Sequence, residues 1–213
     1  KAQRAATDAE SEVAGIRERL HAAERESEAL TAQTKALGRA LEVRGGAADL
    51  VAMGLPGVRG LVSDSVQVTA GYEAAIAAVL GTVAEGVLAE TRDDAFIALE
   101  AARDTDGGAI DVVIARSAPL TPATLQVITG IVAAVDVVSA PDGVLGLLSH
   151  VVIADDLAAA RAAFPALSAT ATAGPLTIVT RGGDVCTEHL LRGGAGGETS
   201  RIALLAERDA AAL

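Results

Sequence analysis

Cys186 and His189 are the residues whose types and spacing come nearest to a reactive site in this 213-residue sequence. A thiol beside an imidazole is the pattern of a cysteine nucleophile with its general base, and both groups are also zinc ligands. Two ligands cannot complete a tetrahedral zinc site, however, and Cys186 is the only cysteine. We therefore interpret Cys186 as a small buried thiol on a strand, and we name no catalytic or metal-binding residue.

The glycine-rich segment from Arg192 to Ser200 (RGGAGGETS) precedes a helical pattern, which raises the question of a phosphate-binding loop. A P-loop places a lysine before its Ser or Thr, whereas Glu198 holds that position here and would repel phosphate. Glycines for tight turns or close backbone approach are the better interpretation, so we predict no cofactor in this chain. The acidic pairs Asp93–Asp94 and Asp155–Asp156 are likewise interpreted as helix caps.

Residues 1–44 carry a heptad pattern that predicts a coiled-coil arm. Apolar or small residues recur with alternating spacings of three and four, at Val13, Ile16, Leu20, Ala23, Ser27, Leu30, Thr34, Leu37 and Leu41. Such a helix would extend roughly 65 Å, too long to lie on one domain, so its seam needs a partner helix. The helix should end at Arg44–Gly45–Gly46. Helical composition returns over residues 198–213, where we expect the start of a returning, antiparallel arm.

Residues 45–197, between the two arms, alternate short β-rich runs with helical runs, which predicts an α/β (α+β) fold. The expected strands are 58–62, 65–68, 86–89, 109–115, 132–138, 151–154 and 176–180. Helices should start near Tyr72, at Thr91 and at Asp155 or Asp156. The second helix should bury Phe96, Leu99 and Ala102, and the third Leu157, Ala160 and Phe164. Segments 84–99 and 149–161 both have the pattern of a strand followed by a capping residue and a helix. We therefore predict two subdomains, about 45–118 and 119–197.

The net charge of −11 lies almost wholly on this central part. Residues 45–197 hold seven arginines, no lysine and seventeen acidic residues, and such a surface repels DNA unless its arginines cluster. The longest uncharged run, 117–135, contains Pro119 and Pro122 and predicts no membrane span. The lone cysteine and the charged N-terminal residues, without a signal peptide, favour a cytoplasmic protein.

Two motifs lie between the predicted coiled-coil segments. The first, from Gly57 to Gly81, reads GVRGLVSDSVQVTAGYEAAIAAVLG, and the second, from Gly183 to Gly194, reads GDVCTEHLLRGG. Together they resemble the hinge of the structural-maintenance-of-chromosomes (SMC) family: the first is similar to the family's opening strand pair and following helix, and the second to its closing Gly-Asp…Gly-Gly motif. The resemblance covers nearly the whole chain, and the Ala- and Arg-rich composition favours a bacterial, actinobacterial member.

The resemblance implies a two-subdomain hinge that forms a two-fold homodimer through edge strands. Gly193 and Gly194, with Leu191 and Arg192, would lie at that interface. The chain opens at Lys1 rather than at Met, so we expect it to be part of a longer protein of chromosome condensation and segregation, associated with the nucleoid. The ATP- and Mg-binding heads of such a protein, and its kleisin-type partners, would lie outside this fragment, which itself would be no enzyme.

Arginines near the arm root are candidate weak DNA contacts: Arg44, Arg181, Arg192 and Arg201. Many bacterial relatives place basic residues just after the closing Gly-Gly, whereas this chain has Ala195-Gly-Gly-Glu198, which argues against direct binding. Two alternatives stay open, a nucleic-acid-binding module and a small α/β enzyme with a coiled-coil oligomerisation tail. The zinc-hook repair ATPases share the architecture, but they need a Cys-x-x-Cys that this sequence lacks.

Overall fold

The computed structural model describes residues 46–105, 108–117, 130–170, 175–193 and 201–211, together with residues 15, 17–21, 24, 25 and 30. Residues 43–206 form one compact unit. Residues 1–42 and 207–213 form a second unit, in which the described residues 17–21 are helical. Most of the heptad positions, and the expected helix end at Arg44 and Gly45, lie outside the described residues, so the coiled-coil arm stays a prediction.

The compact unit is built from two successive sets of short elements. The first contains α2 (Gly46–Ala52), β1 (Val58–Leu61), η1 (Val62–Ser65), β2 (Gln67–Val68), α3 (Glu73–Leu80), η2 (Gly81–Glu85), β3 (Val87–Ala89), α4 (Arg92–Asp104) and β4 (Val112–Ile114). The second contains β5 (Ile131–Ala133), η3 (Ala134–Asp136), β6 (Val138–Ser139), α5 (Asp142–Leu148), β7 (Val151–Ala154), α6 (Leu157–Thr170), β8 (Thr177–Thr180), β9 (Val185–Cys186) and β10 (Leu191–Arg192). Helix α7 (Arg201–Ala211) follows.

The two sets repeat one topology. In each, the first strand pairs antiparallel with the third and the third pairs parallel with the fourth, which gives β1–β3–β4 and β5–β7–β8. The second strands, β2 and β6, pair with each other across the two sets. Strands β9 and β10 then extend the second sheet beyond β8. The strand–cap–helix repeat seen in the sequence is therefore part of a longer structural repeat.

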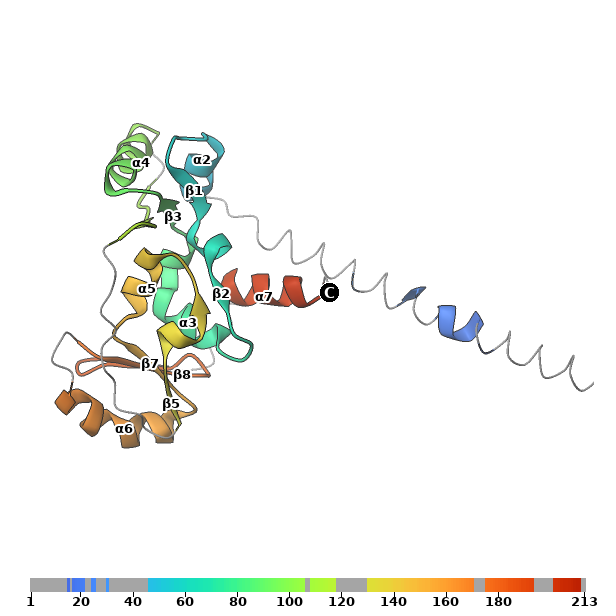
Figure 1. The fold of residues 1–213 in the computed structure, drawn as a ribbon, viewed down its shortest axis with the longest axis vertical. Helices are drawn as coiled ribbons and strands as arrows, with labels where there is room; N and C mark the ends of the chain where they lie inside the picture. Colours follow the sequence, from blue (N-terminus) through green and yellow to red (C-terminus); the bar gives the residue numbers. More distant parts are fainter. Residues whose placement is uncertain are drawn as a thin grey trace, which may run out of the picture. The chain divides into compact units, whose positions relative to one another are not determined.

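The repeats exchange helices. Helix α3, from the first set, packs against β8, and α5, from the second set, packs against β4. Gly143 in α5 lies so close to β4 that a Cβ there would overlap the carbonyl oxygen of Ile114. Each sheet is thus covered on one face by a helix from the other half of the sequence (Figure 1). The subdomain boundary near residue 118 stays a prediction, but the two halves share one central core, to which both contribute residues.

Three hydrophobic cores follow from this layering, with α2 and α4 outside the first sheet, α3 and α5 between the sheets, and α6 outside the second. Alternate residues of a strand face opposite sides, so β7 places Val151 and Ile153 in the central core and Val152 and Ala154 in the core under α6. Because both faces are covered, these strands are continuously apolar. Ile202 of α7 is also buried in the central core.

Local capping confirms two of the expected helix starts. Thr91 caps α4, with its Oγ1 accepting from Asp94 N (3.3 Å) and the Asp94 carboxylate accepting from Thr91 N (3.0 Å), which is a capping box. Asp156 caps the start of α6, because its carboxylate accepts from Ala159 N (2.7 Å). Its neighbour Asp155 forms an ion pair with Arg181 instead, so only Asp156 of this acidic pair caps the helix.

Three expectations were wrong. The single strand expected over 132–138 is two strands, β5 and β6, in different sheets with η3 between them. Ala134 and Val137, between the two strands, are also buried. The apolar pattern therefore continues from β5 to β6, and the sequence gives no sign that the strand is interrupted. Phe96 is 58% exposed, because α4 approaches its sheet through the small residues Ala95, Ala98 and Ala102. Leu157, expected on the buried face of α6, is also exposed.

Candidate functional site

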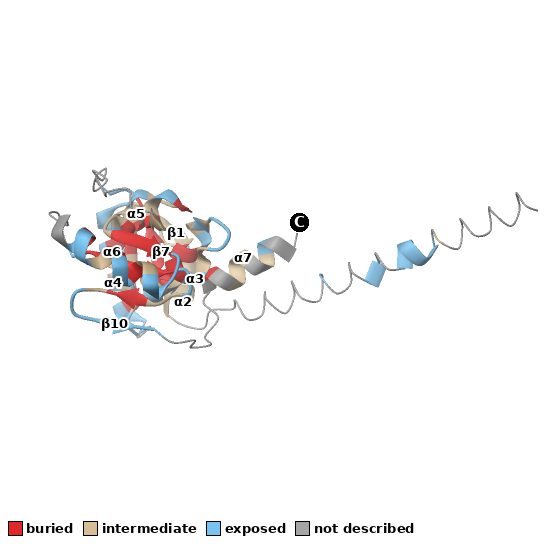
Figure 2. Ribbon diagram, turned by 90° about the horizontal axis from the view of Figure 1, so that it is seen from below, coloured by how far each residue is buried: buried red, intermediate tan, exposed pale blue. Residues whose placement is uncertain are grey.

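Strand β10 ends the second sheet and carries the most exposed large apolar side chain of the described residues. It pairs antiparallel with β9, with Leu191 opposite Cys186, and no other described strand pairs with its outer side. Leu191 is 78% exposed and its neighbour Leu190 is 54% exposed. Figure 2 shows this exposed strand at the surface of a domain whose central strands are buried. An edge strand whose outer side is unpaired is a template for pairing with another chain.

Two tight turns position β10. Between β8 and β9, Thr180 N donates to Asp184 O (2.8 Å), and the buried Thr180 Oγ1 donates to the Asp184 carboxylate (2.8 Å). Between β9 and β10, Thr187 N donates to Leu190 O (2.8 Å) and Thr187 Oγ1 accepts from Leu190 N (3.0 Å). Threonine side chains in both turns therefore hold the edge strand in register.

Gly193, directly after β10, has no room for a side chain. A Cβ at this position would overlap the carboxylate of Asp184, whose other oxygen is held by Thr180. The glycine thus serves the packing of its own chain. Gly193 is also exposed, so its predicted place at a dimer interface is compatible with this role and stays a prediction.

Gly183→Ala should lower the free energy of unfolding by about 1–3 kcal/mol, whereas Gly182→Ala should change it little. Gly183 has a φ of +89°, and a Cβ there would lie 3.3 Å from Ala74 O in α3. At Gly182 the nearest atom to a Cβ would be Thr180 Oγ1, at an ordinary 3.6 Å. Urea unfolding of the two variants measures the difference. Equal stability would show that α3 is not held close to the β8–β9 turn.

Arg181 and Arg192 are two of the candidate DNA contacts. Each donates a hydrogen bond, Arg192 to α3 and Arg181 to Tyr72, the N-cap residue of α3. Arg192 Nη2 donates to Ala78 O (2.9 Å) near the end of the helix. Arg181 Nη2 donates to the hydroxyl of Tyr72 (2.9 Å), its guanidinium lies 4.4 Å from the centre of that ring, and its Nε pairs with Asp155 (2.9 Å). These contacts tie α3 to the second sheet and partly neutralise Arg181.

The remaining predicted site residues are only partly within the described chain. Arg44 and Gly194 lie outside the described residues. Arg201 is the first residue of α7, but its side chain is not among those described. Their roles at an interface or on DNA stay predictions.

Cys186 and His189 differ sharply in environment. Cys186 is buried in β9, and burial, with a further contribution from the negative charge of Asp184, raises the pKa of its thiol. A thiol with a raised pKa stays protonated at neutral pH, which is the opposite of an activated nucleophile. His189 is exposed in the following turn beside Glu188. The described residues contain no group of three or more His, Cys, Asp or Glu side chains placed to hold a metal.

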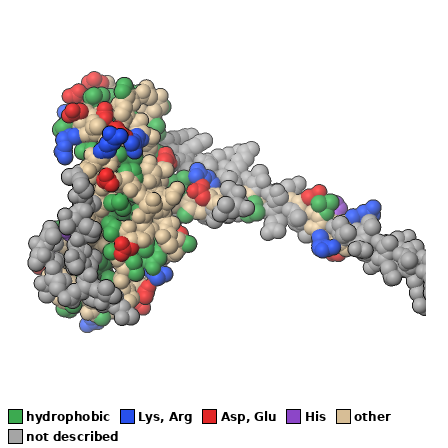
Figure 3. All heavy atoms as spheres, viewed as in Figure 1, with side chains coloured by type: hydrophobic (Ala, Val, Ile, Leu, Met, Phe, Trp, Pro, Cys, Tyr) green, Lys and Arg blue, Asp and Glu red, His purple; other side chains and the backbone are tan. Residues whose placement is uncertain are grey.

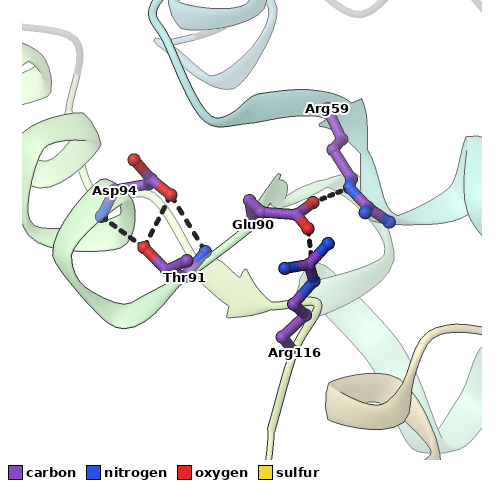
Figure 4. Close-up of polar contacts among 5 residues, drawn as sticks. All are labelled: Arg59, Glu90, Thr91, Asp94 and Arg116. Carbon is purple, nitrogen blue, oxygen red and sulfur yellow. Dashed lines mark hydrogen bonds and ion pairs between the residues drawn. The ribbon is translucent and has the colours of Figure 1, made fainter.

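An ion cluster that the sequence did not reveal joins three strands of the first sheet (Figure 4). Glu90, directly after β3, pairs with Arg59 of β1 and with Arg116, which follows β4 (2.6 Å from Arg116 Nε to Glu90 Oε1). Only the strand order β1–β3–β4 brings these residues together. Figure 3 shows both signs of charge gathered at the α4 end of the domain. The arginines are exposed, so the cluster adds little stability.

Comparison with known proteins identifies related chains. Residues 55–164 match the family model described as "SMC proteins Flexible Hinge Domain". The chain is 33% identical over 201 residues to the chromosome partition protein Smc of Mycolicibacterium paratuberculosis, covering 90% of this chain and 16% of that protein. It is 30% identical over 212 residues to the Smc protein of Mycobacterium tuberculosis, covering 95% of this chain and 17% of that protein. The chain therefore spans about a sixth of the length of these relatives.

Two solved structures share the fold. The SMC hinge domain of Geobacillus stearothermophilus, crystallised as an asymmetric dimer, superposes with a TM-score of 0.72 at 20% identity, covering 91% of this chain and 83% of that one. The hinge domain of the Pyrococcus furiosus SMC protein superposes with a TM-score of 0.55 at 22% identity, covering 78% of this chain and 88% of that one. No described helix of this chain combines the length and the apolar composition that a membrane crossing requires.

Proposed function

This chain belongs to the SMC flexible hinge domain family, and from that premise we propose that it is the homodimerising hinge of a longer chromosome partition protein. The observation that carries the proposal is the exposed edge strand β10, with Leu191 in the strand and Leu190 just before it both open to solvent. The related Geobacillus hinge domain was crystallised as a dimer, which supports the same assembly here. The domain has a connecting role, and we assign it no catalytic step.

In this proposal the hinge joins two coiled-coil arms, residues 1–44 and the segment that starts at about residue 198. Two associated hinges would join four such arms. ATP hydrolysis, Mg binding and kleisin-type partners would belong to regions of the longer protein outside this chain. The enzyme alternative is not favoured, because the Cys186 thiol is buried and has a raised pKa. Weak DNA contact at the arm root stays a prediction, and two of its four arginines already make contacts within the chain.

Sedimentation velocity of the 213-residue chain tests the proposal. We expect a dimer at micromolar concentration, with a weight-average sedimentation coefficient that falls on dilution through the dissociation constant. A chain that stays monomeric throughout the micromolar range would contradict the proposed function.

A further inference from the structure

The outer face of α4 carries two large apolar side chains that lie largely open to solvent. Phe96 is 58% exposed and Ile97 is 47% exposed. Neither belongs to the three hydrophobic cores of the described residues, because α4 packs on its sheet through the alanines of its opposite side. Polar side chains at both positions would leave those cores intact, so packing within the chain does not account for the two apolar residues.

Three carboxylates lie on the same face of α4. Asp93, Glu100 and Asp104 are seven and four residues apart, so they form a row along the helix. Since an α-helix has about 3.6 residues per turn, Phe96 and Ile97 lie on the two sides of this row. All three carboxylates are exposed, and no described side chain forms an ion pair with any of them. Figure 3 shows acidic and hydrophobic side chains next to one another at this end of the domain.

The row of carboxylates decides which kind of partner suits this face. It repels the phosphates of nucleic acids and of anionic lipids. A second copy of this chain is a poor fit as well, because a two-fold contact would bring two rows of carboxylates together. The arginines of α4, Arg92 and Arg103, lie at one margin of the face and leave the row itself negative. A protein segment with basic groups beside apolar ones complements both features.

We propose that the outer face of α4, made of Asp93, Phe96, Ile97, Glu100 and Asp104, docks a basic amphipathic helix of another protein. The apolar side chains of that helix pack on the phenylalanine and the isoleucine, and its Lys or Arg residues lie opposite the carboxylates. Helix α4 is about 20 Å long, so the contact is smaller than a standard interface and the complex is transient. The inference goes beyond the proposed function, because α4 covers the first sheet whereas β10 ends the second.

Fluorescence anisotropy with the full 213-residue chain tests the proposal. The probes are two labelled synthetic helices of about 18 residues with the same leucine stripe, one flanked by lysines and the other by glutamates. The lysine peptide should bind with a dissociation constant on the order of 10–100 µM, and the glutamate peptide at least about tenfold more weakly. Phe96→Ser should raise the constant of the lysine peptide at least about fivefold. The matched control, Leu147→Ser on α5, changes a leucine of similar exposure (51%) and should leave it unchanged.

A charge exchange separates this face from the general acidity of the domain. The double variant Glu100→Lys and Asp104→Lys should reverse the preference, so that the chain binds the glutamate peptide more tightly. Glu85→Lys with Asp136→Lys makes the same change in net charge at two exposed acidic residues elsewhere and should keep the preference for lysine.

Three results would overturn the proposal: no binding of the lysine peptide at about 1 mM, an unchanged constant for Phe96→Ser, or reversal by the control pair. Each would leave the β10-mediated dimer untouched. Sedimentation equilibrium of Phe96→Ser should give the wild-type dimer constant, and a weaker dimer would place α4 in self-association and equally overturn the proposed partner.

Discussion

Leu191→Asp should convert the dimer into a monomer, with the dissociation constant rising at least about 100-fold. The substitution removes a leucine that is 78% exposed in the single chain and places a carboxylate on the outer strand of the sheet. Burying an unpaired charge is far more costly than losing the apolar contact alone, and a two-fold dimer contains the change twice. Sedimentation equilibrium measures the constant, and the thermal unfolding midpoint of the monomer should hardly move.

A control in the predicted arm separates hinge association from coiled-coil association. Leu20 occupies a heptad position in residues 1–44 and is 55% exposed. Leu20→Glu should leave the dissociation constant unchanged if the dimer forms through β10. A Leu191→Asp chain that remained dimeric, or a Leu20→Glu chain that became monomeric, would show that the arms hold the two copies together.

Gly143→Ala should lower the free energy of unfolding by about 3 kcal/mol or more, a large part of the stability of an ordinary domain. A Cβ at Gly143 would overlap the backbone oxygen of Ile114, and a backbone atom cannot rotate away as a side chain can. Helix α5 would have to lift off β4, which exposes the buried Val144 and Leu148. Urea unfolding monitored by circular dichroism measures the loss, with Gly182→Ala as the glycine control that should be tolerated.

The same variant tests the helix exchange. The contact at Gly143 joins a helix of the second repeat to a strand of the first. Failure of that contact should therefore unfold both repeats in one transition, because Val113 and Val144 belong to one core. Wild-type stability for Gly143→Ala would mean that α5 does not approach β4 closely. Two separate transitions would mean that the repeats are independent.

Local features were predictable because their causes are local. Thr91 and Asp94 form a capping box within one turn, and the strand expected at 151–154 matches β7, Val151–Ala154. Helix α5 was not expected, because its Pro-Asp-Gly start at 141–143 also suits a turn. The exposure of Phe96 could not be predicted, since Ala95 and Phe96 are both apolar and only the distance from α4 to its sheet decides which one is buried.

The sequence by itself determined the family, the mixed α/β class and the repeated strand–helix order, because capping residues, apolar runs and glycine positions act over a few residues. Only the tertiary structure decided that α3 and α5 each pack on the sheet of the other repeat, that Glu90 meets Arg59 and Arg116, and that β10 forms an open edge of the second sheet. The physical reason is that an apolar face specifies that it must be buried, but not which surface covers it. That choice depends on strand order and on how closely two backbones approach, as at Gly143 and Ile114.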